Sequence, residues 1–433
     1  MNDSIKIGLI GFGTVGTGVV KLLFEENKPL LRDREIDIDL IKIADLDIIS
    51  DRGIKIPDGI LTTNVDDILD DPQIGIVIEL IGGYEPARSL TLRAFEKGKC
   101  VVTANKALIA KYGRELFEAA NNAGISYLFE ASVGGGIPII RGLNNGLNAN
   151  TIKSIYGILN GTTNYILSGM TRDGVDYDEV LAMAQKLGYA EADPTSDVSG
   201  QDALNKIVIL VRLAFGADLN VETVFCEGIE NLTVQDIDCA GQLGYTVKLL
   251  AIAKRHEGNR IEVRVHPTLV PSESIMAYVE DEFNAVEVDG SAVGRELFYG
   301  KGAGMMPTAS AVVSDCIDIA SRLNAGTRVN FNRHMIEGNG LELIAIEDIT
   351  MRYYLRFTAK DQPGVLFQIS KIFADENISI ESVIQLGASD SDYVPLVIMT
   401  HDALEGDMRR AMRQFEKLEV VHGRIQLIRV EDI

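Results

Sequence analysis

The chain has few cysteines and no long apolar run. Only four of its 433 residues are cysteines, and none has the C-x-x-C spacing of a zinc or redox site. Scattered thiols of this kind are typical of small buried residues in a reducing compartment. Apolar runs such as 74–78 are interrupted by charge far short of the ~20 residues that cross a bilayer, and no basic segment with an apolar one after it opens the chain. We therefore expect a cytoplasmic protein without zinc or a membrane partner.

Positive charge is also scarce. Lysine and arginine number 41 against 63 aspartate and glutamate residues, which gives a net charge of −22. Nucleic acids and anionic membranes bind basic surfaces, so neither is expected as a partner. Apolar content, by contrast, is ample: 46% of the residues are hydrophobic, enough for two or three domains with cores of their own.

A glycine-rich turn lies close to the N-terminus. Residues 5–10 read as a short strand, and Gly-Phe-Gly-Thr-Val-Gly follows directly, before a helix predicted over 17–26. In this context the first glycine allows a tight turn, the second lets the backbone approach a pyrophosphate, and the third allows close helix packing. A structural glycine turn is the alternative. The predicted dinucleotide contacts here are Gly11, Gly13, Thr14, Val15 and Gly16.

A second predicted strand, 38–44, ends at Asp45, where an acid can bind the adenosine ribose of NAD. The spacing from the glycines exceeds the usual ~20 residues because 27–37 reads as an inserted polar loop. Asp45 would repel the 2′-phosphate of NADP, but Arg52 and Lys55 follow closely. We expect NAD or NADP as the cofactor, with NAD favoured.

Strands and helices alternate up to about residue 130, which predicts an α/β domain with a Rossmann-type doubly wound parallel sheet. The segments are a strand at 74–81, a helix at 86–97 and a strand at 99–103. Ligands bind at the carboxyl ends of such strands, and a helix at 309–323 is expected to return to this domain. These ends add cofactor contacts at Gly82, Thr103, Lys106 and, before the return helix, Gly302. A solvated loop lysine is the alternative for Lys106.

The segment 188–210 crowds four acids against an apolar helix. Asp202 and Lys206 fall one turn apart on one face of that helix, which we expect to begin after an N-cap at Ser199. The apolar residues of this face direct Lys206 inward. A partly desolvated lysine beside carboxylates has the adjustable pKa that general acid/base catalysis requires, although a surface ion pair is the alternative. The neighbouring polar stripe is predicted to face water: Gln201, Asn205 and Arg212.

Two later segments carry ligand-type groups at strand ends. Glu130 precedes a glycine turn whose backbone oxygens can surround a hard cation, or which simply turns the chain. A strand predicted over 151–159 ends in Asn-Gly-Thr-Thr-Asn. These five residues can bind a polar small molecule or cap a helix that starts near Tyr165.

The composition changes after residue 324. A polar connector, 326–350, precedes a region, 351–433, with strand, helix, strand, strand, helix, strand order. Its turn Asp-x-Pro-Gly-Val-Leu, at 361–366, fixes the backbone with proline and leaves amide groups at a helix N-terminus for a carboxylate. This region resembles an ACT domain, a βαββαβ amino acid sensor; a purely structural dimerisation module is the alternative.

Together these segments, from about residue 5 to 325, resemble the homoserine dehydrogenase family. The resemblance implies reduction of aspartate 4-semialdehyde to homoserine by NAD(P)H, on the route to threonine, methionine and isoleucine, in a homodimer or homotetramer. It also implies a dinucleotide-binding domain at 1–130 with a return helix at about 302–323, and an α+β catalytic and dimerisation domain at 131–325. The ACT domain at 351–433 looks detachable, because the connector is polar.

The resemblance assigns roles to individual residues. Lys206 and Lys106 would be catalytic, because the alkoxide left by hydride addition needs a cationic proton donor. The five histidines lie outside every candidate loop. Substrate contacts would come from Glu191, Asp197, Asp202, Asn160, Gly161 and Thr162. A monovalent cation such as Na⁺ would bind Glu130 and the backbone oxygens of Val133, Gly135 and Ile137. Threonine, as feedback effector, would bind Asp361, Pro363, Gly364, Val365, Leu366, Asn377 and Ile378.

Two alternatives remain at this level. A catalytically silent sensor would keep the dinucleotide site and the tail, but the presence of both lysines and the acids argues against it. A phosphorylating semialdehyde dehydrogenase would need an activated cysteine nucleophile. No cysteine has such a setting: Cys100 lies in a predicted strand and Cys316 in an apolar helix.

Overall fold

The protein is described by a computed structural model covering residues 4–26, 36–327, 339–385 and 392–433. Its contacts divide the chain into two compact units, which we describe separately. The first unit comprises 1–155, 205–223 and 284–341, and the second comprises 156–204, 224–283 and 342–433. The predicted loop at 27–37 and the centre of the predicted connector at 326–350 lie largely outside the described residues.

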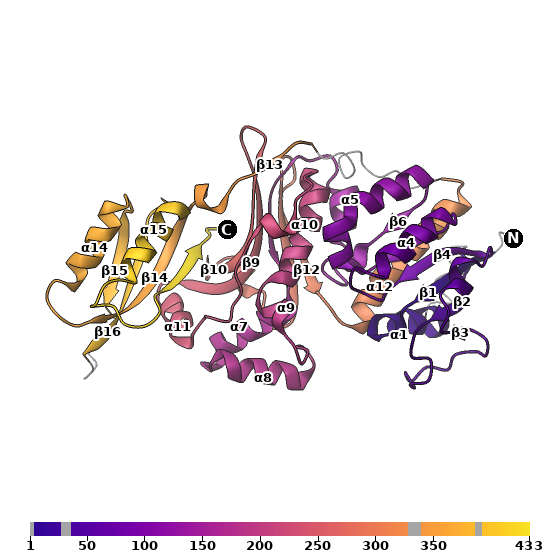
Figure 1. The fold of residues 1–433 in the computed structure, drawn as a ribbon, viewed down its shortest axis with the longest axis horizontal. Coiled ribbons are helices and arrows are strands. Elements are labelled where there is room, and N and C mark those ends of the chain that lie inside the picture. The colour runs from indigo at the N-terminus through magenta and orange to yellow at the C-terminus, as the bar shows by residue number, and fades with distance from the viewer. Residues whose placement is uncertain (1–3, 27–35, 328–338, 386–391) are drawn as a thin grey trace. The chain divides into compact units, whose positions relative to one another are not determined.

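The first unit is built on a six-stranded sheet in the order β3-β2-β1-β4-β5-β6 (Figure 1). Every neighbouring pair in it is parallel. The order reverses between β1 and β4, which is where a doubly wound sheet opens its ligand crevice. The predicted fold class is confirmed. The strands are β1 (Ile5–Ile10), β2 (Ile38–Ala44), β3 (Leu61–Thr62), β4 (Ile74–Glu79), β5 (Cys100–Thr103) and β6 (Tyr127–Leu128).

Helices accompany these strands, and α1 packs against the returning helix α12. A Cβ atom at Gly18 would lie 2.7 Å from the carbonyl oxygen of Met305, so glycine is what allows this approach. Helix α12 covers nearly the same residues as the predicted return helix. The helices are α1 (Thr14–Lys21), continued by a π-helical turn (Leu22–Glu26), α3 (Asp66–Leu69), α4 (Ala87–Glu96), α5 (Lys106–Ala123) and α12 (Met305–Asn324).

The rest of the first unit consists of helices and of three neighbouring strands in the order β12-β11-β7. Its elements are η2 (Glu130–Ser132), α6 (Ile139–Arg141), η3 (Gly142–Gly146), the first half of β7 (Ile152–Ile158), most of α10 (Gln201–Phe215), η4 (Val221–Thr223), β11 (Phe283–Gly290) and β12 (Gly294–Lys301).

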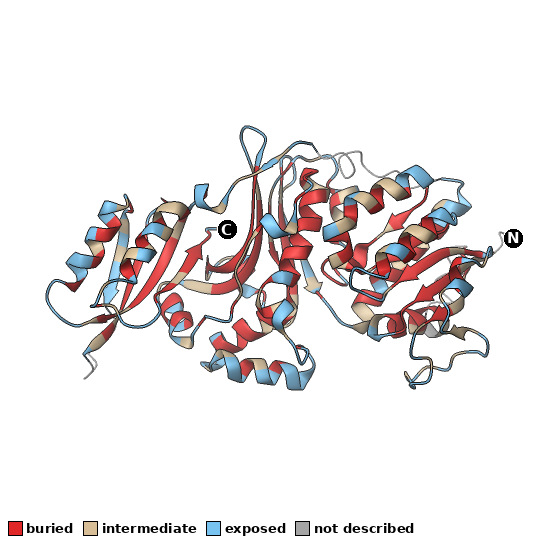
Figure 2. Ribbon diagram, viewed as in Figure 1, coloured by how far each residue is buried: buried red, intermediate tan, exposed pale blue. Residues whose placement is uncertain are grey.

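In the second unit, β9 (Tyr245–His256) and β10 (Arg260–Pro271) form a long antiparallel hairpin. Figure 2 shows this hairpin buried along most of its length, in keeping with ten consecutive buried residues in β10. None of the helices in the described ranges is long and apolar enough to cross a membrane. The accompanying elements are α7 (Gly161–Asp173), α8 (Tyr177–Leu187), α9 (Thr195–Val198), β8 (Phe225–Cys226), α11 (Val234–Gln242) and η5 (Ile275–Tyr278).

The C-terminal part of this unit has the predicted βαββαβ order. Three aromatic rings pack together in its core. The Phe415 ring centroid lies 5.1 Å from that of Phe357 and 4.8 Å from that of Phe373. The elements are β14 (Thr350–Lys360), α14 (Val365–Asp375), β15 (Ile380–Gln385), β16 (Tyr393–Thr400), α15 (Glu405–Phe415) and β18 (Gln426–Val430), with the short β13 (Glu342–Leu343), η6 (Ile346–Asp348) and β17 (Ala403–Leu404).

The expectation that this tail is detachable did not include the strand pairing that joins it to the rest of the second unit. Strand β18 pairs with β14 on one side and, at Thr268↔Arg429 and Leu269↔Val430, with β10 on the other. The order β9-β10-β18-β14-β16-β15 is therefore one continuous sheet. Just past β18, the carboxylate of Glu431 lies 2.7 Å from the buried guanidinium of Arg264 in β10. The polar composition of the connector gave no indication that β18 pairs with β10.

Candidate active site

The glycine turn has the geometry of a pyrophosphate site. Gly11 has a φ of 102°, a conformation that favours glycine, and a Cβ at Gly16 would lie 2.3 Å from the Gly11 carbonyl oxygen. A Cβ at Gly13, in contrast, would meet no described atom within 4 Å, so this side is open for a ligand. Gly13 also precedes α1, whose first N–H groups suit an anion. The helix begins three residues earlier than predicted.

Asp45 lies against this turn and shares the position with Arg52. Its carboxylate accepts hydrogen bonds from the backbone N–H of Phe12 at 2.5 Å and of Asp47 at 2.8 Å. The Arg52 guanidinium is 3.7 Å from Asp45, donates to the Phe12 carbonyl oxygen and stacks on the Phe12 ring at 4.7 Å. A carboxylate and a guanidinium thus lie together at the end of β2, where the ribose of a dinucleotide is expected.

A polar network that sequence reasoning missed joins the ends of β4 and β5. The buried Glu79 carboxylate accepts from the Thr103 hydroxyl at 2.7 Å, and burial raises the pKa of Glu79. The Asn105 amide donates to the Gly83 carbonyl oxygen at 2.7 Å, while its oxygen caps α5. Lys106 is the first residue of that helix. The sequence contained one signal for this network: Glu79 is an acid that interrupts an apolar run at the end of a strand.

Lys206 is buried, as predicted, with 7% of its surface exposed, one turn after the buried Asp202 in α10. Two expectations about this helix were wrong. The Ser199 N-cap is not formed, because Gly200, with a φ of 83°, separates Ser199 from a helix that begins at Gln201. Asn205 and Arg212 are also buried; the Arg212 guanidinium donates to the Ile109 carbonyl oxygen at 2.9 Å instead of facing water.

Three of the predicted substrate residues meet in the second unit. The side-chain nitrogen of Asn160 donates to Asp197 and to Asp202, at 2.8 Å in both cases. Its oxygen accepts from the Thr163 N–H at 2.8 Å and so caps α7, which begins at Gly161, four residues before the predicted start. One amide therefore both starts a helix and holds two carboxylates together. We call Asn160, Asp197 and Asp202 the acid cluster.

The other predicted substrate residues have different settings. The Thr162 hydroxyl donates to the Tyr189 carbonyl oxygen at 2.7 Å. Glu191 is exposed, and its carboxylate makes no hydrogen bond to the acid cluster among the described residues. Asn164 is structural: its amide nitrogen donates to the carbonyl oxygens of Val279, Asp281 and Phe283. The helix-capping interpretation of this loop is thus correct for Asn160, and it does not exclude binding.

The Glu130 region is buried and strongly hydrogen-bonded. The carboxylate accepts from the backbone N–H groups of Ile140 and Arg141 at 2.9 Å, and burial, together with nearby Asp315, raises the pKa of Glu130 to about 7. Gly135 touches Gly302, since a Cβ on it would lie 2.6 Å from the Gly302 carbonyl carbon. Asn284 packs on Gly302, and its buried amide has no hydrogen-bond partner among the described residues. Sequence reasoning missed Asn284 and Asp315.

At the predicted effector turn, Gly364 has a φ of 92° and precedes α14. The Gln385 amide donates to Asp361 at 3.3 Å, and Asn377 has a φ of 58° where the chain enters the strand after the helix. Val365 and Ile378 are buried, whereas Leu366 is exposed. The turn thus has the predicted backbone form.

The cysteines offer no nucleophile. All four are free thiols, and Cys100, Cys239 and Cys316 are buried. Burial raises the pKa of Cys226 to about 12 and those of Cys239 and Cys316 above their usual range, so a thiolate is disfavoured. A reaction through a cysteine adduct is therefore a poor fit. The open glycine turn between β1 and α1 is typical instead of a dinucleotide-dependent oxidoreductase.

Comparison with known proteins gives the particular family. Residues 11–130 match the NAD-binding domain of homoserine dehydrogenase, residues 138–317 match the homoserine dehydrogenase family, and residues 353–420 match the ACT domain. A homoserine dehydrogenase from a Synechocystis species is 46% identical over 99% of both chains. The crystal structure of a homoserine dehydrogenase from Thiobacillus denitrificans superposes with a TM-score of 0.92 at 45% identity, covering 99% of each chain. The chain belongs to the homoserine dehydrogenase family.

It is accordingly an NAD(P)-dependent oxidoreductase that converts aspartate 4-semialdehyde to homoserine, with an ACT domain suited to amino acid regulation. A hyperthermophilic archaeal homoserine dehydrogenase in complex with NADPH is also similar, with 26% identity and a TM-score of 0.62, over 74% of this chain and 98% of that one.

Proposed function

We propose that Lys206 is the acid that protonates the alkoxide formed by hydride addition to the semialdehyde, and that the acid cluster binds the substrate ammonium. The observation that carries this proposal is the Asn160 amide, which holds Asp197 and Asp202 together one helical turn before a buried lysine. Carboxylates fixed in advance lose no further freedom when they bind a cation. Lys106, at the start of α5, is the second catalytic lysine.

A substrate comparison tests the role of the acid cluster. The full chain is assayed with aspartate 4-semialdehyde and with succinate semialdehyde, which has the same aldehyde and carboxylate but no ammonium group. We expect kcat/KM to be at least about a hundredfold lower for succinate semialdehyde, because the buried Asp202 and the half-buried Asp197 would be left without their cation. Equal kcat/KM for the two aldehydes would rule out the acid cluster as the ammonium site.

For the cofactor, we propose that the enzyme uses both NAD and NADP. Asp45 supports NAD by accepting from the ribose hydroxyls, and Arg52, stacked on Phe12, offers its charge to a 2′-phosphate. Since the two side chains lie 3.7 Å apart, each weakens the other's selectivity. The remaining cofactor contacts are proposed where the sequence predicts them: Gly11, Gly13, Thr14, Val15, Gly16, Gly82, Thr103, Lys106 and Gly302.

A monovalent cation is proposed beside Glu130. The carbonyl oxygens of Val133 and Gly135 accept no hydrogen bond from a described backbone N–H group, which leaves them suited to Na⁺. The Ile137 oxygen fits less well, because it accepts from the Ile139 N–H at 2.8 Å. Glu130 would balance the charge from within its hydrogen bonds. When bound, the ion would hold the glycine turn against Gly302.

Threonine is proposed as the effector of the turn at 361–366 and the strand start at 377–380, with a homodimer or homotetramer as the assembly. The support is the backbone form of the turn, with amide groups at the start of α14. Cytoplasmic localisation stays a prediction from the sequence.

A further inference from the structure

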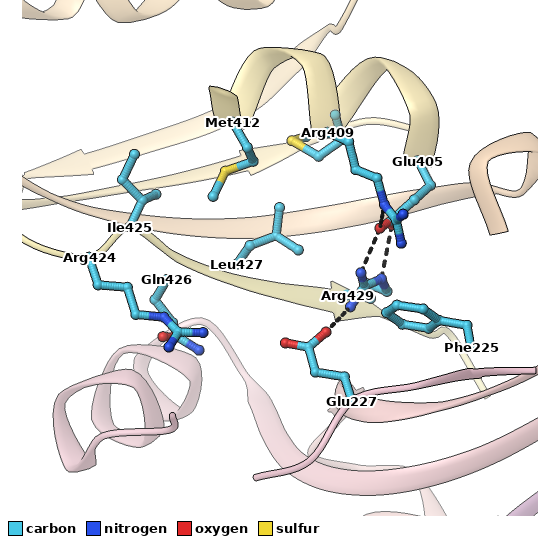
Figure 3. A pocket seen from close by; sticks show the side chains of 11 residues that line it. Phe225, Glu227, Glu405, Arg409, Met412, Arg424, Ile425, Gln426, Leu427 and Arg429 are labelled. Atoms are coloured by element: carbon cyan, nitrogen blue, oxygen red, sulfur yellow. Dashed lines mark hydrogen bonds and ion pairs between the residues drawn. The ribbon is translucent and has the colours of Figure 1, made fainter. Parts of the chain in front are cut away.

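A pocket lies outside both the acid cluster and the effector turn. Its volume is about 270 Å³, and it is bounded by β8 and the following residue, by α15 and by the start of β18 (Figure 3). The sheet is split here: β10 pairs with β8 at Phe225 and Cys226 but with β18 only at Arg429 and Val430. The split leaves residues 424–427 of the chain facing an open space.

The backbone edge of β18 is available in this split. The Glu431 N–H donates to the Leu269 carbonyl oxygen, so residues 431, 429 and 427 direct their backbone groups away from β14. The ladder with β10 stops at Arg429, and Leu427 therefore presents a backbone N–H and C=O that no described strand pairs. Such an edge can hydrogen-bond a small molecule that has both a donor and an acceptor.

One end of the pocket is closed by a fixed ion network. Arg429, which is buried, donates to Glu405 in α15 at 2.6 and 2.9 Å and to Glu227 after β8 at 2.7 Å. The Phe225 ring lies 4.7 Å from the same guanidinium. Each nitrogen of the Arg429 guanidinium donates to one of these carboxylates, whereas the second oxygen of Glu227 has no described hydrogen-bond donor.

The other end has polar groups that are not neutralised. Arg424 is exposed and has no carboxylate within 4 Å among the described residues; its partner is the neutral amide of Asn231. Gln426 is buried, with 6% of its surface exposed, and its side-chain amide makes no hydrogen bond to a described residue. Figure 3 shows the Arg424 and Gln426 side chains together, away from the ion network. Between the two ends the wall is apolar: Met408, Met412, Ile425 and Leu427.

From this arrangement we infer that the pocket binds an α-amino acid with an aliphatic side chain. A carboxylate is expected at Arg424 and Gln426, an ammonium group at the free oxygen of Glu227, and the side chain against the methionine, isoleucine and leucine wall. Methionines adapt to ligands of different shape, which suits leucine, isoleucine or methionine. The uncompensated arginine favours an anion, and the facing carboxylate favours a cation on the same molecule.

The pocket is connected to the acid cluster through β8. The Cys226 thiol lies 3.3 Å from the Ser199 carbonyl oxygen, and the Ile229 N–H donates to the Val198 carbonyl oxygen at 2.9 Å. Gly228 fits so closely that a Cβ on it would lie 2.2 Å from that same oxygen. Residues 198 and 199 directly follow Asp197. A ligand that displaces Glu227 therefore shifts the segment that positions the acid cluster, which makes the pocket an effector site.

Binding is measured by titration calorimetry on the full chain with L-leucine, L-isoleucine and L-methionine. The comparators 4-methylpentanoate and isopentylamine each lack one of the two charges. We expect an aliphatic amino acid to bind and both comparators to bind at least tenfold more weakly. Arg424→Gln and the cavity-filling Met412→Trp should each weaken binding at least tenfold. Arg413→Gln, an exposed arginine of α15 outside the pocket, should leave it unchanged.

The activity measurement rests on the proposed function and is kept separate from binding. We expect the bound amino acid to change the KM for aspartate 4-semialdehyde at least about fivefold, the usual lower range of coupling between sites, and Arg424→Gln to abolish that change. No binding of any aliphatic amino acid to a catalytically active wild-type chain would overturn the inference alone. Equal affinity in the wild type, Arg424→Gln and Met412→Trp would also overturn it, because the ligand would then bind elsewhere.

Discussion

At the scale of single residues, burial decides which charges do chemistry. Lys206 and Asp202 are buried within one turn of each other, and the Asn160 amide fixes Asp202. A charge out of water persists only with partners, so groups of this kind are held in position. Exposed Glu191 is not held in this way, which makes it the weakest of the predicted substrate contacts.

Cofactor choice depends on Asp45 and Arg52. We expect Asp45→Asn to raise the ratio of kcat/KM for NADPH to that for NADH, because it removes a negative charge near the 2′-phosphate. Arg52→Gln should lower the same ratio, on the order of tenfold, by removing the charge-assisted contact. Lys186→Gln, at an exposed site on α8, is the control and should change little. An unchanged ratio in both variants would place the ribose elsewhere.

Lys248 gives a pH dependence of stability. Burial lowers the pKa of this lysine from 10.5 to about 8, and its ammonium donates to the Val279 carbonyl oxygen at 2.5 Å. Between pH 8 and 10.5 the unfolded chain binds more protons at this site than the folded chain does. The free energy of unfolding therefore increases as the pH rises through this window.

The measurement is denaturant unfolding at pH 7.5 and 9.5. The wild type should gain stability over this interval relative to Lys248→Met, which lacks the titrating group. Lys186→Met, at an exposed site on α8, should follow the wild type. If wild type and Lys248→Met change in parallel, the ammonium is not desolvated as its burial indicates.

At the scale of elements, strand ends position the polar groups. Glu79 ends β4, Thr103 ends β5 and Asn160 follows β7, each at a carboxyl end from which the chain turns into a helix or loop. The order and type of these elements followed from local signals, such as the glycines after β1 and the apolar runs of β4 and β5. The start of α7 was misplaced because Asn160 was not recognised as its cap.

Other features depended on partners distant in the sequence. Arg212 looks solvent-facing on its own helix, yet it is buried because Ile109, more than a hundred residues earlier, offers it a carbonyl oxygen. The pairing of β18 with β10 and the bond between Glu431 and Arg264 likewise join segments far apart in the chain. Periodicity reports which face of an element is apolar, but it contains no information about which polar groups find a buried partner.

Asn160 separates helix capping from substrate binding. Asn160→Ala removes the cap of α7, at a cost of about 1 kcal/mol in stability, and frees Asp197 and Asp202. Asn160→Ser keeps a capping oxygen but cannot donate to both carboxylates. We expect both variants to raise the KM for aspartate 4-semialdehyde, on the order of tenfold, while only the alanine variant lowers the melting temperature clearly. An unchanged KM in both would reduce Asn160 to a cap.

At the scale of the whole molecule, the C-terminal region is part of a shared sheet. Its last strand, β18, adds to β10 of the hairpin, and Arg264 is left with Glu262 and Glu431 as its buried acidic partners. Regulation through such a region does not require a separate domain that moves as a body, because Glu227 at the proposed pocket is close in sequence to Cys226 and Ile229, which contact the residues that follow Asp197.

Removal of residues 351–433 should therefore damage the dehydrogenase itself. The deletion exposes the β10 edge and leaves Arg264 short of a partner, and breaking a buried pair alone costs on the order of 3 kcal/mol. We expect a fragment that aggregates or melts well below the full chain, as measured by calorimetry and size-exclusion chromatography. Removal of residues 432 and 433 alone is the control. A soluble, fully active fragment ending at residue 350 would contradict this prediction and support the expectation from the sequence that the tail is detachable.

The central claim is that Lys206, one turn after the acid cluster, protonates the product alkoxide. The measurement is NADPH and NADH oxidation with aspartate 4-semialdehyde by wild type and Lys206→Ala, together with fluorescence titration of the cofactor. We predict that Lys206→Ala lowers kcat by about two to four powers of ten, the range of general acid catalysis, with the cofactor Kd nearly unchanged. Wild-type kcat in Lys206→Ala would contradict the account and leave Lys206 as an ion-pair partner only.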